Sequence, residues 1–178
     1  GVSWCATCDG FFFKDKEIAV VGGGDSALEE ALFLTTYASK VYLIHRRDSL
    51  RASDIMQQRV FDNPKIEVLW NSVVSEIHGD SKLEEVVLTD TVTGATRDMK
   101  LDGLFIAIGS DPRIEMVKDQ LEITDQNTIA VQGRSSKTSL PGVFAAGDVI
   151  DPTYRQAIVA AGSGAVAALD AQHYLENL

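Results

Sequence analysis

Apolar runs and amphipathic stretches alternate along the first part of the chain. Runs of four or five apolar or alternating residues at 18–21, 41–44 and 66–70 have the length and composition of buried parallel strands. The stretches at 25–37 and 52–61 repeat apolar residues at helical spacing, and the second stops just before an Asn-Pro pair. The pattern therefore predicts a βαβαβ order and a parallel α/β domain.

The pattern changes after residue 72. Short strands are predicted at 73–77, 83–88 and 99–101, separated by turn-forming sequences. They indicate an antiparallel meander inserted before a last, fully apolar strand at 104–108. The first domain is accordingly expected to span 1–111.

The pattern is weaker in the remainder of the chain, 112–178. Short strands are expected at 129–131 and 143–146, and an alanine-rich helix from about 155 to 175. The sequence 162–167 fits G-x-G-x-x-A, but no strand precedes it. We interpret it as a close-packing part of the helix rather than as a nucleotide-binding turn.

A glycine turn follows the first strand and leads into the first helix. Gly22, Gly24 and Ala27 fill the G-x-G-x-x-G/A pattern in its required setting of strand, turn and helix, and Asp25 or Ser26 can cap the helix. This setting predicts a doubly wound, Rossmann-like fold that binds a dinucleotide pyrophosphate at the helix N-terminus. The residues expected at that site are Gly22, Gly23, Gly24, Asp25, Ser26 and Ala27.

Basic residues follow the second strand. A site for NAD would place an acidic residue there, against the ribose 2′-hydroxyl, but this chain has His45, Arg46 and Arg47, with Arg51 shortly after. One guanidinium group can bind two oxygens of a phosphate at once. The four basic residues therefore predict a ribose 2′-phosphate, and hence NADPH. A simple tight turn and a solvated basic loop are the alternatives, and the spacing of the two motifs disfavours both.

Two cysteines stand in C-x-x-C spacing near the N-terminus. The loop between Cys5 and Cys8 is too short for a disulfide to contribute much entropic stabilisation, which favours a redox pair. Zinc needs about four ligands, and the three histidines are scattered, so no metal site is expected. Asp9 is either an acid/base partner of the thiols or a turn former. The three aromatic residues at 11–13 are expected to anchor the core.

Composition limits the class of partner and the compartment. The formal net charge is −10 and the isoelectric point is about 4.7, which argues against a nucleic-acid partner. No apolar segment has the length of a membrane span, and no signal peptide is recognisable, so a cytoplasmic location is expected. The chain starts at Gly1, close to a motif, from which we expect a further segment upstream.

The predicted NADPH site and the C-x-x-C pair can exchange electrons only through an intermediary. A nicotinamide donates hydride, whereas a disulfide opens with an electron pair that leaves a thiolate. A flavin accepts the first and supplies the second, so the chemistry predicts FAD.

At this point the chain resembles the low-molecular-weight thioredoxin reductases. The resemblance extends over nearly the whole chain and rests on the sequences Cys5-Ala-Thr-Cys-Asp-Gly10, Gly22-Gly-Gly-Asp-Ser-Ala27, His45-Arg-Arg-Asp-Ser-Leu-Arg-Ala52, Ala107-Ile-Gly109, Pro141-Gly-Val-Phe-Ala-Ala-Gly-Asp148 and Arg155-Gln-Ala157. It implies that Cys5 and Cys8 are the redox pair, that Cys8 is nearest the flavin, and that Asp9 is the acid/base. It also implies a thioredoxin-like protein substrate and a homodimer. Further cofactor contacts implied by the resemblance are Ile108, Gly109, Gly147, Asp148, Arg155, Gln156 and Ala157.

One departure from the family is large. Its members begin with an FAD-binding half that carries its own glycine turn, whereas the resemblance here starts after it. Residues 112–178 would then be the C-terminal part of a second Rossmann-like, FAD-binding domain, and FAD would not be held stably by this chain alone. Two other interpretations remain open: an NADPH-binding fragment without turnover, and a related flavoprotein with a different protein partner.

Overall fold

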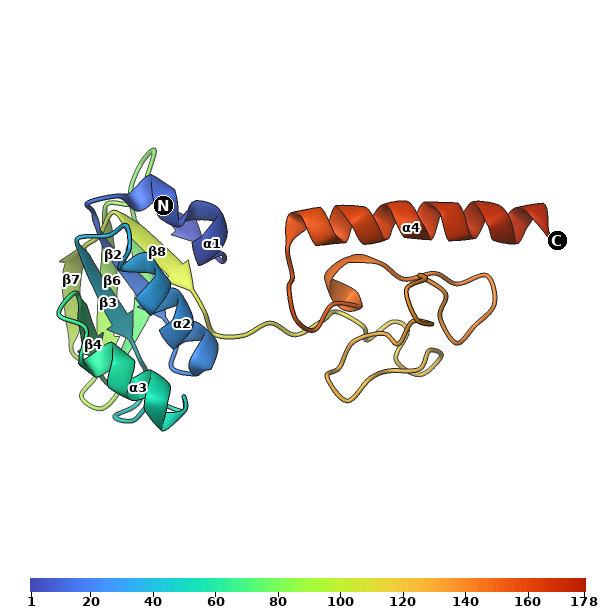
Figure 1. The fold of residues 1–178 in the computed structure, drawn as a ribbon. Coiled ribbons are helices and arrows are strands. Elements are labelled where there is room, and N and C mark those ends of the chain that lie inside the picture. Colours follow the sequence, from blue (N-terminus) through green and yellow to red (C-terminus); the bar gives the residue numbers. More distant parts are fainter. The chain divides into compact units, whose positions relative to one another are not determined.

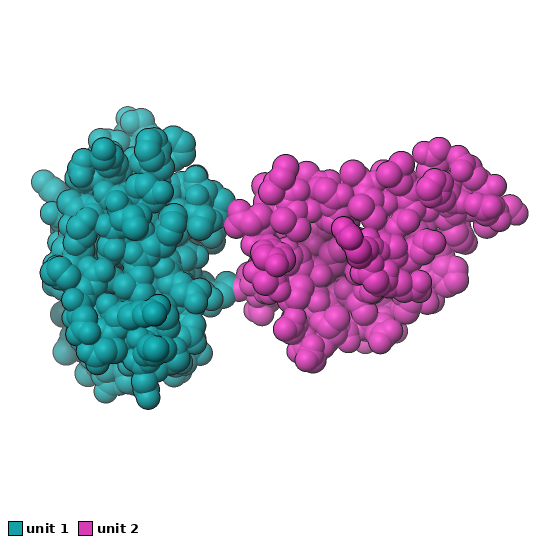
Figure 2. Space-filling view, in the orientation of Figure 1, with its two compact units in different colours: residues 1–109 teal, residues 110–178 magenta.

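The computed structural model describes all residues from 1 to 178 and divides them into two compact units, 1–109 and 110–178 (Figure 2). The division lies beside the expected end of the first domain at residue 111. Each unit is described by itself below.

The centre of the first unit is a five-stranded parallel sheet with the order β1-β8-β2-β3-β4 (Figure 1). The predicted apolar runs form four of these strands. The fifth is a two-residue edge strand that the apolar pattern did not indicate, and it pairs with β8. The strands are β1 (Val2–Ser3), β2 (Glu17–Val21), β3 (Lys40–Ile44), β4 (Ile66–Leu69) and β8 (Gly103–Ile106).

Helices cover one face of this sheet. They are α1 (Ala6–Asp9), the 3-10 turn η1 (Gly10–Phe13), α2 (Asp25–Leu34) and α3 (Asp54–Phe61). Leu28, Leu34 and Phe105 are fully buried between the layers. Helix α2 ends before the expected residue 37, because the hydroxyls of Thr35 and Thr36 donate back to carbonyl oxygens of its last turn.

The meander forms a separate antiparallel sheet with the order β5-β6-β7, as the sequence predicts. Its strands are β5 (Ser72–His78), β6 (Glu85–Asp90) and β7 (Thr96–Lys100). Val86 and Leu88 of β6 pack against Ala19, Ile44 and Leu104 on the second face of the parallel sheet. This unit therefore has three layers, and a small sheet covers the face on which a doubly wound domain commonly carries helices.

The second unit contains η2 (Gly147–Val149), the long helix α4 (Ala157–Glu176) and extended loops. The strands expected at 129–131 and 143–146 do not form. Each region makes a single bridge, Ile123 with Ile129 and Lys137 with Phe144, because its backbone groups pair with short neighbouring loops instead of a continuous strand.

Helix α4 is confirmed, and the sequence 162–167 lies inside it, as expected. None of its residues is buried. Its apolar side chains include Ile158 and Leu169, which are 80% and 56% exposed. No helix of the structure is both long enough and apolar enough to cross a membrane.

Candidate functional site

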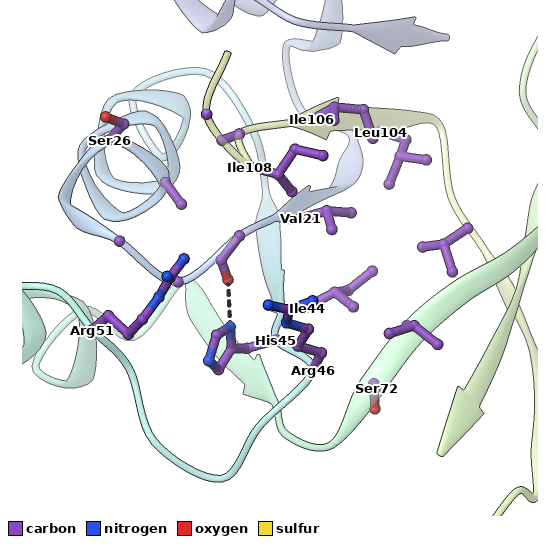
Figure 3. A pocket seen from close by; sticks show the side chains of 18 of the residues that line it. Val21, Ser26, Ile44, His45, Arg46, Arg51, Ser72, Leu104, Ile106 and Ile108 are labelled. Carbon is purple, nitrogen blue, oxygen red and sulfur yellow. Dashed lines mark hydrogen bonds between the residues drawn. The ribbon is translucent and has the colours of Figure 1, made fainter. Parts of the chain in front are cut away.

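A cavity of about 830 Å³ opens in the first unit at the carboxyl edge of the parallel sheet (Figure 3). One wall is the glycine turn with the start of α2, and the other consists of apolar side chains from β5 and β8. Ligands bind at this edge in open α/β sheets. The lining residues that the sequence predicted are Gly22, Gly23, Gly24, Asp25, Ser26, Ala27, His45, Arg46, Arg51, Ile108 and Gly109.

The three glycines of the turn differ in the space that surrounds them. A Cβ on Gly22 would collide with the carbonyl of Ala107 and with the Cβ of Ala27, and one on Gly23 would enter the ring of His45. A Cβ on Gly24 would meet nothing within 4 Å. Gly22 and Gly23 are therefore required by packing, whereas Gly24 leaves backbone open to the cavity, as a bound pyrophosphate requires.

Gly24 is also the residue that caps α2, so the predicted cap at Asp25 or Ser26 is wrong. Oδ1 of the Asp25 carboxylate instead accepts the backbone N–H and the hydroxyl of Ser53. The first N–H groups of the helix have no carbonyl partner within the helix, and the residues that carry them line the cavity.

His45 is buried, with 5% of its surface exposed, and connects two backbone segments. Its Nδ1 lies 3.0 Å from the carbonyl oxygen of Gly22 (Figure 3), and its Nε2 lies 2.9 Å from that of Ser49. Its ring therefore connects the segment 45–51 to the glycine turn. The ring also lines the cavity and does not project into solvent.

Two of the three predicted arginines meet at the cavity. Arg46 and Arg51 line it, are exposed, and have no carboxylate within ion-pair distance. Arg47 is exposed but does not line the cavity. The cavity thus presents two guanidinium groups without a carboxylate partner, both from the segment that follows β3.

The apolar wall was missed by sequence reasoning. It is formed by side chains from β5, from the ends of β2 and β3, and from β8, and Figure 3 shows Leu104 and Ile106 across the cavity from Arg51 and Ser26. Alternation along the meander predicted strands but not which side chains face the parallel sheet. The missed residues are Val21, Ile44, Ser72, Val73, Val74, Ile77, Leu104, Ile106 and Ala107.

Cys5 and Cys8 form a disulfide across the first turn of α1, with their Cα atoms 5.3 Å apart. The side chain of Cys8 is exposed. Asp9 follows it and accepts a hydrogen bond of 2.7 Å from the hydroxyl of Ser3, which also accepts from the N–H of Cys5. Ser3 is 4% exposed, and no motif in the sequence indicates this role.

The aromatic residues beside the disulfide divide into two groups. Phe13 packs on Phe105 with ring centroids 5.2 Å apart, so core anchoring is correct for it alone. Phe11 and Phe12 are 66% and 72% exposed, and Trp4 is 72% exposed. The disulfide is therefore accompanied by an aromatic patch on the surface.

The residues expected at the flavin lie together in the second unit. Gly147 and Asp148 belong to η2, which contacts α4, and Arg155, Gln156 and Ala157 lead into that helix. Asp148 and Arg155 are exposed.

Arg155 has a positive φ of 49°, which is uncommon for a long side chain. Asp151 supports this backbone by accepting the N–H groups of Thr153, Tyr154 and Arg155 at 2.8–2.9 Å. Burial raises the pKa of the Asp151 carboxyl, but these donors outweigh it and lower the pKa below its usual value.

Comparison with known proteins agrees with this geometry. Residues 1–164 match the family described as pyridine nucleotide-disulphide oxidoreductase, and the chain belongs to this family. It is 60% identical over all its residues to the thioredoxin reductase of Streptomyces clavuligerus, of which it covers 55%. It is 54% identical to thioredoxin reductase 2 of Arabidopsis thaliana, of which it covers 48%.

A solved structure has the same fold as this chain. The thioredoxin reductase of Streptococcus pyogenes superposes with a TM-score of 0.89 at 46% identity, and the match covers all of this chain and 58% of that one. The chain thus spans about half the length of the relatives that it matches. The resemblance to the thioredoxin reductases is confirmed.

Proposed function

We propose that this chain provides the NADPH-binding domain, the redox disulfide and the C-terminal part of the FAD-binding domain of a reductase that transfers electrons from NADPH to a thioredoxin-like protein disulfide. The observation that supports this most directly is one compact unit that contains both a dinucleotide-shaped cavity with two unpaired arginines and a surface-exposed disulfide.

The residues at the cavity fit NADPH part by part. Gly24 and the start of α2 would hold the pyrophosphate, because backbone and helix dipole both favour an anion there. Arg46 and Arg51 would bind the 2′-phosphate, and Arg47 would contribute long-range charge only. The apolar wall at Leu104 and Ile106 would exclude water from the rest of the coenzyme.

In the second unit, Asp148 and residues 155–157 would hold the flavin end of FAD. The exposed carboxylate suits the hydroxyls of a ribityl chain, and the start of α4 suits the polar edge of the ring. A flavin held there would supply the chemistry that links hydride donation by a nicotinamide to reduction of a disulfide. A purified sample that is yellow with near-stoichiometric FAD would contradict our expectation that this chain alone holds FAD weakly.

At the disulfide, two electrons break the Cys5–Cys8 bond and leave one thiolate and one thiol after a proton is taken up. Asp9 would exchange that proton; its position next to Cys8 in the chain and its hydrogen bond from Ser3 support this role. A thiolate then attacks the disulfide of the partner protein, and the second cysteine resolves the mixed disulfide. Trp4, Phe11 and Phe12 offer this partner an apolar contact beside the disulfide.

Coenzyme titration tests the proposal. NADPH should bind at least about a hundredfold more tightly than NADH, because only NADPH carries a phosphate for charge-assisted hydrogen bonds. Arg46→Ala and Arg51→Ala should each remove a large part of this preference. Arg59→Ala is the matched control, since Arg59 is an exposed cation of the same unit that does not line the cavity. Equal dissociation constants for the two coenzymes in the unmodified chain would overturn the assignment.

A further inference from the structure

The loop that carries Arg46 and Arg51 is fastened to the glycine turn at three successive points. The ring of His45 lies against the carbonyl of Gly22, and the N–H of Arg51 donates to the carbonyl of Gly23 at 2.8 Å. At the third point the backbone N–H and the hydroxyl of Ser53 both donate to Oδ1 of Asp25, at 2.9 and 2.8 Å. Only this third fastening includes a hydrogen bond between two side chains.

The carboxylate of Asp25 has an unfavourable charge for its position. It lines a cavity that is expected to receive phosphates, and it carries the same sign of charge. The hydrogen bond from the Ser53 backbone and then that from its hydroxyl lower the pKa of Asp25, so the group stays ionised at neutral pH. By charge alone, Asp25 would weaken the binding of an anionic coenzyme.

The geometry points to a different role. We propose that Asp25 is a positioning residue: its bond to Ser53 holds the arginine loop in the phosphate-binding conformation before the coenzyme arrives, and so increases the preference for the 2′-phosphate. This rests on the proposed function, because the loop has a specificity role only if the cavity binds NADPH.

The physical reason is preorganisation. An exposed arginine loses conformational freedom when it binds a phosphate, and the loss is larger if its backbone must also become ordered. Arg51 is two residues from Ser53, and its own N–H is already bonded to Gly23. The bond to Gly23 and the bonds to Asp25 therefore fix the backbone at Arg51 and just after it, and they leave the Arg51 guanidinium free to reach the ligand.

Charge repulsion and loop positioning predict opposite changes of NADPH affinity when Asp25 is replaced, which makes the proposal testable. Removing its charge in Asp25→Ala would tighten coenzyme binding if electrostatic repulsion dominated. Release of the loop would instead weaken NADPH binding, by about tenfold for two lost hydrogen bonds, and change NADH binding much less. Asp48→Ala is the matched control, because Asp48 is an exposed carboxylate of the same loop with no hydrogen bond or ion pair.

The experiment is titration of NADPH and NADH into the unmodified chain and the variants Asp25→Ala, Asp25→Asn, Asp48→Ala and Asp25→Ala/Arg51→Ala. We expect Asp25→Ala to lose NADPH affinity selectively and Asp48→Ala to leave it equal or slightly higher. Asp25→Asn keeps the acceptor oxygen and should restore most of the affinity. In the Arg51→Ala background the effect of Asp25→Ala should largely vanish. Tighter NADPH binding by Asp25→Ala, or an equal loss for both coenzymes, would overturn the proposal.

Amide hydrogen exchange separates this proposal from the proposed function. Exchange at Ser53 and Arg51 should accelerate in Asp25→Ala and not in Asp48→Ala, without any coenzyme present. If the unmodified chain fails to discriminate NADPH from NADH, the proposed function fails and the exchange result still decides whether the Asp25–Ser53 bond orders the loop. Unchanged exchange in Asp25→Ala would refute that ordering.

Discussion

The two units use apolar residues in opposite ways. In the first unit, both faces of the parallel sheet are covered, and side chains such as Phe105 and Leu104 have no exposed surface. In the second unit, four apolar residues are buried, and the 20-residue helix α4 buries none. Helix formation in α4 therefore follows its local sequence of alanine and leucine, whereas the sheet of the first unit is stabilised by burial.

This difference indicates where each unit needs a partner. The first unit covers both faces of its own sheet and leaves exposed its cavity and the aromatic side chains Trp4, Phe11 and Phe12. The second presents Ile158, Leu169 and Leu175 along an uncovered helix, and its loops at 129–131 and 143–146 do not extend into strands. We expect this apolar surface to be covered if two copies of the chain associate, as the resemblance to the thioredoxin reductases implies.

The largest effect is expected in the core of the first unit. Phe105→Ala removes a fully buried ring and should lower the free energy of unfolding of this unit by about 3–5 kcal/mol. Both tryptophans, Trp4 and Trp70, lie in the first unit, so their fluorescence during urea unfolding reports on it selectively. Val92→Ala is the control, because Val92 is 76% exposed. If Val92→Ala lowered the free energy of unfolding as much as Phe105→Ala, the layered core would be refuted.

A smaller, pH-dependent effect is expected in the second unit. Asp170 of α4 accepts the N–H and the hydroxyl of Ser136 at 2.8 and 2.7 Å. These bonds, from the backbone and then the hydroxyl, lower the pKa of Asp170 in the folded chain. The stabilisation is therefore complete above its unfolded pKa of about 3.9 and is lost as pH falls through the lower folded value.

Amide exchange at Ser136, corrected for the intrinsic effect of pH, measures this loss. Acid should accelerate it in the unmodified chain, whereas Asp170→Ala should show fast exchange at every pH. Asp119→Ala should behave like the unmodified chain, because Asp119 is exposed and makes no hydrogen bond. Acid acceleration that persists in Asp170→Ala would show that another group is responsible.

The smallest effect is expected on the uncovered helix itself. Leu169→Gln should change the stability of a dilute monomer by less than about 0.5 kcal/mol, because the side chain is 56% exposed. Thermal unfolding followed by circular dichroism at several protein concentrations provides the measurement. A larger loss that grows with protein concentration would instead identify Leu169 as part of a dimer contact and sharpen the contrast between the units.

The sequence by itself determined the elements that depend on neighbouring residues. Apolar runs specified the strands of the parallel sheet, and glycines directly after β2 specified the turn, because a strand, a tight turn and a helix in succession admit few other structures. Two cysteines at C-x-x-C spacing specified the disulfide. These features are encoded within a few residues of each other.

Only the tertiary structure decided which distant residues meet. Ser3 reaches Asp9 because β1 pairs with the edge of β8, and β5 closes the cavity because the meander folds over the second sheet face. Asp25 pairs with Ser53 across 28 residues, a contact that no local pattern encodes. The strand expected at 143–146 is reduced to a single bridge between Phe144 and Lys137, because the backbone with which it pairs, 136–138, is itself a short loop.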